Sequence, residues 1–73
     1  MSKLEVESDL AGNVWKVEVE VGDSVEADDV LIILESMKME IPIESPVAGR
    51  VTQIMVVPED VVKEGQVLVT LET

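Results

Sequence analysis

The chain has 73 residues, which is enough for one domain and leaves little room for a second. Sixteen acidic residues against five basic ones give a net charge of −11, and this charge opposes binding to nucleic acid or anionic lipid because like charges repel. The sequence contains neither Cys nor His, which excludes disulfides, thiolate nucleophiles, the usual general base and the commonest metal ligand.

Short β-strands are predicted along the chain, and no segment makes a convincing helix. Apolar residues alternate with acidic ones at 4–6 and at 17–21, which is the pattern of half-buried strands. Continuous apolar runs at 30–34 and 67–71 predict more deeply buried strands. A proline in the middle of 41–43 favours an edge strand there, because proline cannot donate to a ladder.

The most informative feature of the sequence is an internal repeat. Residues 3–36 align with residues 40–73 without a gap, at an offset of 37 positions. The identical pairs are Glu7/Glu44, Ser8/Ser45, Ala11/Ala48, Gly12/Gly49, Val14/Val51, Val19/Val56, Asp23/Asp60, Val25/Val62, Val30/Val67, Leu31/Leu68, Leu34/Leu71 and Glu35/Glu72. A repeat this short cannot bury its apolar face alone, so the two copies must pack on each other. We therefore expect one all-β domain over residues 1–73, a flattened antiparallel β-sandwich or barrel.

Turn signals fall at equivalent places in the two copies. The matching positions are Gly12 with Gly49, Gly22 with Glu59, and Asp28 with Gly65. Gly and Asp both tolerate a positive φ, so the same tight turn can serve both copies.

Three residues, Met37, Lys38 and Met39, lie between the two copies. Hydrophobic patterning alone would run one strand from Val30 through Ile43, but the repeat requires the chain to reverse between the copies. A joint between two packed halves lies at the surface. If the reversal is a two-residue turn, both of its non-glycine residues take a positive φ, at a cost of about 1–2 kcal/mol each.

The residues at this joint form a candidate functional site. A lysine at a hairpin tip is most often only solvated, but here two methionines flank Lys38, and exposed thioethers make adaptable contacts with a partner. Glu35 and Glu40 bracket the tip. Lysine side chains are ordinarily ammonium ions near neutral pH, so a partner enzyme would have to deprotonate Lys38 before acylating it.

The segment Glu-Ser-Met-Lys-Met-Glu at 35–40 closely resembles the attachment motif Glu-Ala-Met-Lys-Met of biotin carboxyl carrier domains, in the biotin/lipoyl attachment family. The resemblance covers essentially the whole chain, including 17–23, 41–49 and 67–72. It implies a barrel-sandwich hybrid of two antiparallel four-stranded sheets related by quasi-two-fold symmetry, with the lysine on a β-turn.

The same resemblance implies a carrier role without catalysis. Biotin protein ligase would use ATP to join biotin to the Lys38 amine, and the domain would then carry carboxybiotin from a biotin carboxylase site to a carboxyltransferase site. Met37 and Met39 would help these partners recognise the tip, and Glu35 and Glu40 would tune the choice of ligase. Ser36 replaces the family's usual Ala and adds a hydroxyl that bears on ligation.

The chain departs from the family pattern in several places. Leu10-Ala11-Gly12 stands where Pro-Met-Pro-Gly is common. The gapless repeat leaves no room for the protruding thumb that some bacterial acetyl-CoA carboxylase carriers insert before the attachment hairpin. The start at Met1 favours a free-standing small carrier over an excised domain.

Three alternatives remain open. Lipoyl domains share the expected fold and exposed lysine, although their tip generally reads Asp-Lys-Ala, and one fold can host both chemistries, so lipoate alone or dual modification is the nearest rival. An unmodified acidic interaction module would suit the charge of −11 but has no need of Met-Lys-Met. A metal or catalytic site is disfavoured, because the acids at 26–29 lack the glycine turn and terminal Glu of a calcium loop.

The apolar runs at 30–34 and 54–57 are far shorter than the roughly 20 residues of a membrane span, and the N-terminus lacks an apolar signal core. We therefore expect a cytoplasmic, monomeric domain. Trp15 is expected to pack at the rim of the core or against a strand.

Overall fold

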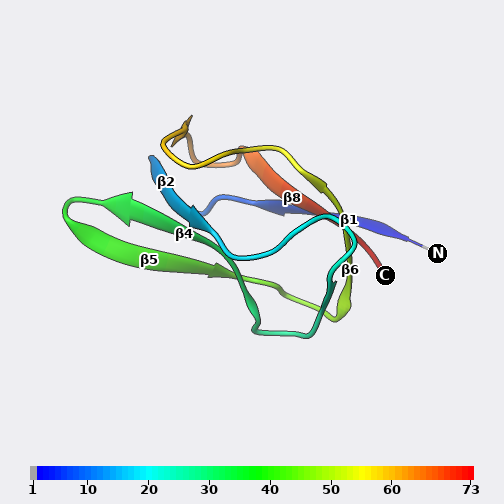
Figure 1. Ribbon diagram of the computed structural model, residues 1–73. Coiled ribbons are helices and arrows are strands. Elements are labelled where there is room, and N and C mark those ends of the chain that lie inside the picture. Colours follow the sequence, from blue (N-terminus) through cyan, green and yellow to red (C-terminus); the bar gives the residue numbers. More distant parts are fainter. Residues whose placement is uncertain (1) are drawn as a thin grey trace.

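The computed structural model describes residues 2–73, and its regular elements are all strands (Figure 1). The strands are β1 (Lys3–Glu7), β2 (Gly12–Val17), β3 (Ser24–Val25), β4 (Val30–Ser36), β5 (Met39–Glu44), β6 (Gly49–Ile54), β7 (Val61–Val62) and β8 (Val67–Glu72). Adding 37 to the bounds of β2 and β3 gives the bounds of β6 and β7, so the sequence repeat is also a structural one.

The strands form two four-stranded sheets with the orders β1-β8-β6-β3 and β5-β4-β2-β7. Every pairing is antiparallel. The offset of 37 converts the first order into the second, strand for strand, so the two sheets are related by quasi-two-fold symmetry. Each sheet contains strands from both halves of the sequence. The expected fold class, including its symmetry, is confirmed.

Hydrogen bonds between the halves occur in equivalent pairs. The backbone N–H of Ser8 donates to the carbonyl of Gln66 at 2.9 Å, and the N–H of Ser45 donates to the carbonyl of Asp29 at 2.8 Å. Both serines are buried, and each hydroxyl donates to a backbone carbonyl two residues further on. These contacts fasten the corners where the chain passes between the sheets.

An aliphatic core fills the space between the sheets. Its buried members are Val6, Val14, Val25, Leu31, Ile32, Leu34, Ile43, Val51, Val56, Val62, Leu68, Val69 and Leu71. Burial of branched aliphatic side chains on facing sheets is the main favourable contribution to the stability of such a sandwich.

The prediction of a strand at 17–21 is wrong beyond Val17. β2 ends at Val17, and the following segment leaves its sheet to reach β3 in the other one. Val19 packs against the core while Val21 is 62% exposed. The alternating pattern arises because an extended crossing segment also turns successive side chains to opposite sides. Pro42, in contrast, lies on the edge strand β5 as expected.

The turn signals have two different physical causes. Asp28 and its equivalent Gly65 both have positive φ, 74° and 85°, which confirms a shared tight turn. Gly12 and Gly49 instead begin β2 and β6, and their φ values do not require glycine.

The two strand glycines are required by close packing. A Cβ on Gly12 would lie 2.9 Å from the carbonyl oxygen of Glu35, and a Cβ on Gly49 would lie 2.8 Å from that of Glu72. Both contacts are with backbone, so neither can be relieved by turning a side chain. Gly12 therefore lets β2 approach β4 next to the β4–β5 hairpin, and Gly49 does the same for β6 and β8.

We expect Gly12→Ala and Gly49→Ala each to lower the free energy of unfolding by about 1–3 kcal/mol, because the added methyl must push two paired strands apart. Urea denaturation followed by circular dichroism measures this loss. Asn13→Ala, at the exposed neighbouring position, is the control and should change stability by less than about 0.5 kcal/mol. Alanine variants as stable as the unchanged protein would contradict the packing argument.

The molecule is elongated, with extents of 37 × 18 × 17 Å. The β4–β5 hairpin projects at one end and both termini lie at the other (Figure 1). Ser2 and Thr73 exchange backbone hydrogen bonds of 2.8 and 3.2 Å, which extends the β1–β8 ladder to the chain ends. No helix in residues 2–73 is long and apolar enough to cross a membrane.

Candidate attachment site at the β4–β5 hairpin

The β4–β5 hairpin closes with a two-residue turn. Ser36 pairs with Met39, so only Met37 and Lys38 lie between the strands. Their φ values are 52° and 66°, the left-handed pair that a type I′ hairpin turn requires. The three-residue joint expected from the sequence is thus a two-residue turn, and Met39 is the first residue of β5.

This turn is held against the intrinsic preference of its residues. Type I′ turns favour Asn-Gly because those residues tolerate positive φ, whereas Met and Lys in this region cost about 1–2 kcal/mol each. The flanking ladder, which continues from Ser36 back to Val30, provides the pairing that fixes the turn. Strain kept in this way at a surface turn points to a functional requirement for its side chains.

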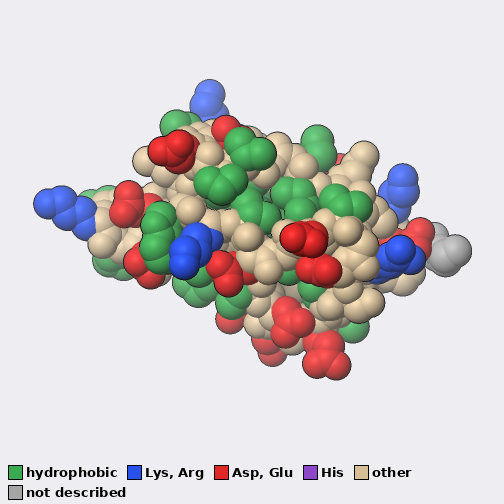
Figure 2. Space-filling view, viewed as in Figure 1, with side chains coloured by type: hydrophobic (Ala, Val, Ile, Leu, Met, Phe, Trp, Pro, Cys, Tyr) green, Lys and Arg blue, Asp and Glu red, His purple; other side chains and the backbone are tan. Residues whose placement is uncertain are grey.

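The side chains at the turn are directed into solvent. Lys38 is exposed, Met37 is 91% exposed and Met39 is 61% exposed. Figure 2 shows hydrophobic, acidic and basic side chains meeting at the end of the molecule that carries the hairpin. The site therefore offers a primary amine that an approaching protein can reach, beside two apolar thioethers that it can contact.

Glu35 and Glu40 lie directly opposite each other on β4 and β5. Both are exposed, and like charges in opposed positions destabilise a ladder. Ser36 is half-buried, and its Cβ lies 3.5 Å from the position that a Cβ on Gly12 would take. One hairpin thus brings together all six residues singled out in the sequence, and they form an exposed tip rather than an enclosed pocket.

A covalently attached cofactor suits this geometry. An amide to the Nζ atom of Lys38 requires an accessible amine and no preformed cavity. The exposed turn meets that condition, and its position at the end of the long axis lets an enzyme reach the tip without obstruction by the body of the domain.

The sequence interpretation missed a groove beside the hairpin. It is lined by Asn13, Val14, Trp15, Glu35 and Glu59. Trp15, expected at the core rim or against a strand, is 42% exposed, and the Nζ atom of Lys16 lies 4.6 Å from the centre of its ring. The sequence holds one indication of this groove. The two repeats differ at its lining residues, because Trp15 aligns with Thr52 and Glu59 aligns with Gly22.

A family model described as "Biotin-requiring enzyme" matches residues 4–71 of the chain. The chain belongs to the biotin/lipoyl attachment family. Its two symmetric sheets and its lysine on a two-residue turn agree with what the sequence resemblance implied. It is a carrier domain of the biotin-requiring type, and biotin is the cofactor that the family description supports.

Relatives and solved structures agree with the family match. The chain is 62% identical over 34 residues to the "Biotin/lipoyl attachment protein" of Bacillus subtilis, which is 47% of each chain. It is 44% identical over 39 residues to "Biotinylated protein TB7.3" of Mycobacterium tuberculosis, 53% of this chain and 55% of that protein. The alignments thus span about half the length of these curated relatives.

The crystal structure of Kluyveromyces lactis urea carboxylase superposes on this biotin/lipoyl attachment domain with a TM-score of 0.92 and 32% identity. The match covers 99% of this chain and 6% of the much larger carboxylase chain. The domain therefore resembles a small part of the urea carboxylase chain.

Proposed function

We propose that Lys38 is the biotin attachment residue and that the domain carries carboxyl groups between a biotin carboxylase site and a carboxyltransferase site. The observation that carries this proposal is the geometry of the tip. Lys38 occupies the left-handed turn of a two-residue hairpin at one end of an elongated domain of a biotin-requiring family. Among residues 2–73, no other lysine lies on such a turn.

In this role the domain contributes position rather than catalysis. Biotin, when attached, supplies a ring nitrogen that holds the carboxyl group. The ladder between β4 and β5 holds the lysine backbone in one conformation while the side chain extends into solvent. A tethered group meets the next active site at a high effective concentration, so the carboxyl group does not diffuse into bulk solvent.

The residues around Lys38 act on the partners in this proposal. Biotin protein ligase must remove a proton from the ammonium before the amine can attack an activated acyl group. Met37 and Met39 offer flexible apolar contacts to the ligase and the carboxylase, and Glu35 and Glu40 tune the choice of ligase through their charge. We also propose a cytoplasmic location, which supplies the ATP that ligation consumes.

Co-expression with a single ligase, followed by intact-mass measurement, tests the proposal. The protein is produced with a biotin protein ligase in one culture and with a lipoate ligase in another, each supplied with its acid. We expect a mass increase of one biotinyl group in the first culture, located on Lys38 by peptide fragmentation. Biotin found on a different residue, or no addition at all, would contradict it.

Lipoyl or dual modification is the second candidate function. It is favoured by the name of the Bacillus subtilis relative, "Biotin/lipoyl attachment protein", at 62% identity over 34 residues. Both acids form the same amide with a lysine, so the exposed turn accepts either. The lipoate culture decides between them, because mass added only by lipoate ligase would replace the biotin proposal and mass added in both cultures would extend it.

A further inference from the structure

The groove beside the hairpin has a symmetric counterpart at the other end of the molecule. The groove near the tip, about 350 Å³, is lined by Asn13, Val14, Trp15, Glu35 and Glu59. The groove near the termini, about 240 Å³, is lined by Val21, Gly22, Arg50, Val51, Thr52 and Glu72. Every residue of the tip groove becomes a residue of the terminal groove on adding or subtracting 37. The terminal groove is therefore an internal reference for what the fold alone requires.

The two grooves differ in charge. In the terminal groove Arg50 accompanies Glu72, so their formal charges cancel. In the tip groove Asn13 replaces the arginine and Glu59 joins Glu35, so the formal charge is −2. The fold tolerates a charge-balanced groove at this position, whereas the lining of the groove near the tip holds two carboxylates and no cation.

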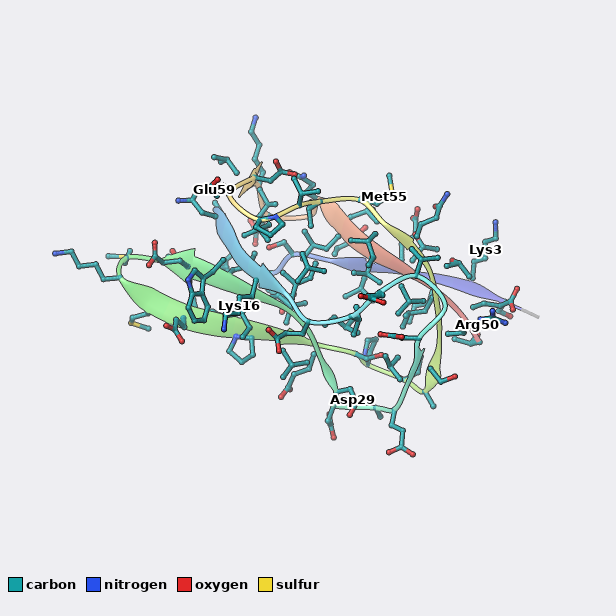
Figure 3. The ribbon with its side chains drawn as sticks, in the orientation of Figure 1. Lys3, Lys16, Asp29, Arg50, Met55 and Glu59 are labelled. Carbon is teal, nitrogen blue, oxygen red and sulfur yellow. The ribbon has the colours of Figure 1, made fainter. Side chains whose placement is uncertain are left out.

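The tip groove also carries an aromatic face where its counterpart has Thr52. Trp15 is 42% exposed, and the ammonium of Lys16 already lies 4.6 Å from the centre of its ring. This contact shows that a cation can lie over the indole ring, and a guanidinium from a partner would replace the Lys16 ammonium there. In Figure 3, Lys16 and Glu59 lie toward the hairpin end, while Lys3 and Arg50 lie near the termini.

Glu59 occupies a position that the fold would fill more easily with glycine. Its φ is 79°, and the equivalent residue is Gly22 with a φ of 100°. A side chain in this left-handed region strains the backbone, and here that side chain is a carboxylate lining the groove. The strained residue appears at the tip groove and not at its counterpart.

From these observations, and resting on the proposed function, we propose that the tip groove binds an arginine side chain of the biotin protein ligase while the ligase acylates Lys38. A guanidinium stacks on an indole face and pairs with a carboxylate in a bidentate manner, so Trp15 and Glu59 together match it. The ligase is the expected occupant because it meets the domain before any biotin is attached. Its recognition must therefore depend on contacts with the protein itself.

The location of the groove fits an enzyme bound at the tip. Glu35 lines the groove and lies in the strand that leads to Lys38. Asn13 pairs with Glu35 across the β2–β4 ladder. The groove therefore extends from β4 of the hairpin onto the neighbouring strand β2. A ligase surface covering the turn would also cover this groove.

Substitution by the residues of the terminal groove tests the inference with variants that the fold accepts. Trp15→Thr and Glu59→Gly are made singly and together, and initial rates of biotinylation are measured against the concentration of unmodified protein with saturating biotin and ATP. We expect the double variant to raise KM for the carrier by roughly five- to tenfold with kcat within about twofold. Glu59→Gly should also raise the melting temperature, because it relieves backbone strain.

Ionic strength gives an independent readout of the same contact. The KM of the unchanged protein should rise with added salt, because the contact joins opposite charges near the surface. The double variant should show a weaker dependence. Equal salt dependence would indicate that Glu59 does not face a cation of the ligase and would overturn the inference.

Two matched controls separate this groove from general effects. Glu72→Gln removes a carboxylate from the terminal groove, and Met55→Ala removes an exposed apolar side chain (Figure 3). Both should leave KM within about twofold of the unchanged protein. Unchanged KM in the double variant, or equal increases in the controls, would overturn the inference. Failure of the unchanged protein to be biotinylated would overturn the proposed function and the inference with it.

Discussion

Exchanging the two turn residues, by combining Met37→Lys with Lys38→Met, is expected to slow biotinylation at least about 100-fold, the size of effect that a small misplacement of a reacting group produces. Both positions have positive φ, 52° and 66°, and both already carry unbranched side chains, so the exchange adds little backbone strain. The amine, however, leaves the turn one residue earlier and points in a different direction. A ligase that receives the tip in one orientation then finds the thioether where the amine should be.

Lys38→Arg completes this test, because a guanidinium remains protonated and cannot act as the acyl acceptor. We expect it to abolish biotin attachment, as followed by intact mass over time. Lys63→Arg changes another exposed lysine and should be modified at the normal rate. Rapid biotinylation of the exchanged variant would show that the direction of the amine is unimportant. Biotin on the Lys38→Arg variant would show that another residue is the attachment site.

The internal repeat explains why so much of the fold was predictable. Strand pairing in a sheet joins residues far apart in the sequence, so local hydrophobic patterns do not predict it. A repeat too short to fold alone, however, must pack on its own copy. That requirement placed a chain reversal at Met37-Lys38, where pattern alone would have continued the strand. It also anticipated the matching turns at Asp28 and Gly65, because residues in equivalent places need the same backbone conformation.

The errors lie where one local pattern fits two structures. Alternation at 17–21 is equally compatible with a paired strand and with an extended crossing between sheets, and only the position of β3 in the other sheet separates them. Glycine is common in turns, so the sequence pattern predicts turn residues at Gly12 and Gly49. Their actual role depends on the carbonyl oxygens of Glu35 and Glu72, which lie far away in the sequence.

The candidate site also has one part that the sequence predicts and one part that it does not. The hairpin is local, so its six residues follow from one stretch of sequence. The tip groove combines β2, β4 and the turn before β7, and no sequence pattern brings Trp15 close to Glu59. Comparison of the two repeats could have marked both residues as divergent, but the shared groove appears only once the strands are assembled.

Leu34→Ala and Leu71→Ala are expected to lower the free energy of unfolding by about 2–5 kcal/mol each, the range for removing a buried leucine side chain beyond Cβ. Both leucines are fully buried, at 0% exposure, and occupy equivalent places in β4 and β8. A domain of this size has a total stability of only roughly 4–11 kcal/mol, so either variant loses a large share of it. Val61→Ala, at a side chain that is 72% exposed, is the control.

The two variants should also unfold in one transition each, with similar midpoints in urea. Each sheet contains strands from both halves of the chain, so neither half can lose its strands while the other keeps a complete sheet. Fluorescence of Trp15, the one aromatic residue, reports on β2, and far-ultraviolet circular dichroism reports on all the strands. Coincident curves from the two probes, shifted equally for Leu34→Ala and Leu71→Ala, are therefore the expected result. Separate transitions would mean that the quasi-two-fold halves are independent folding units. The conformation of the hairpin turn would then depend only on the stability of the unit that contains β4.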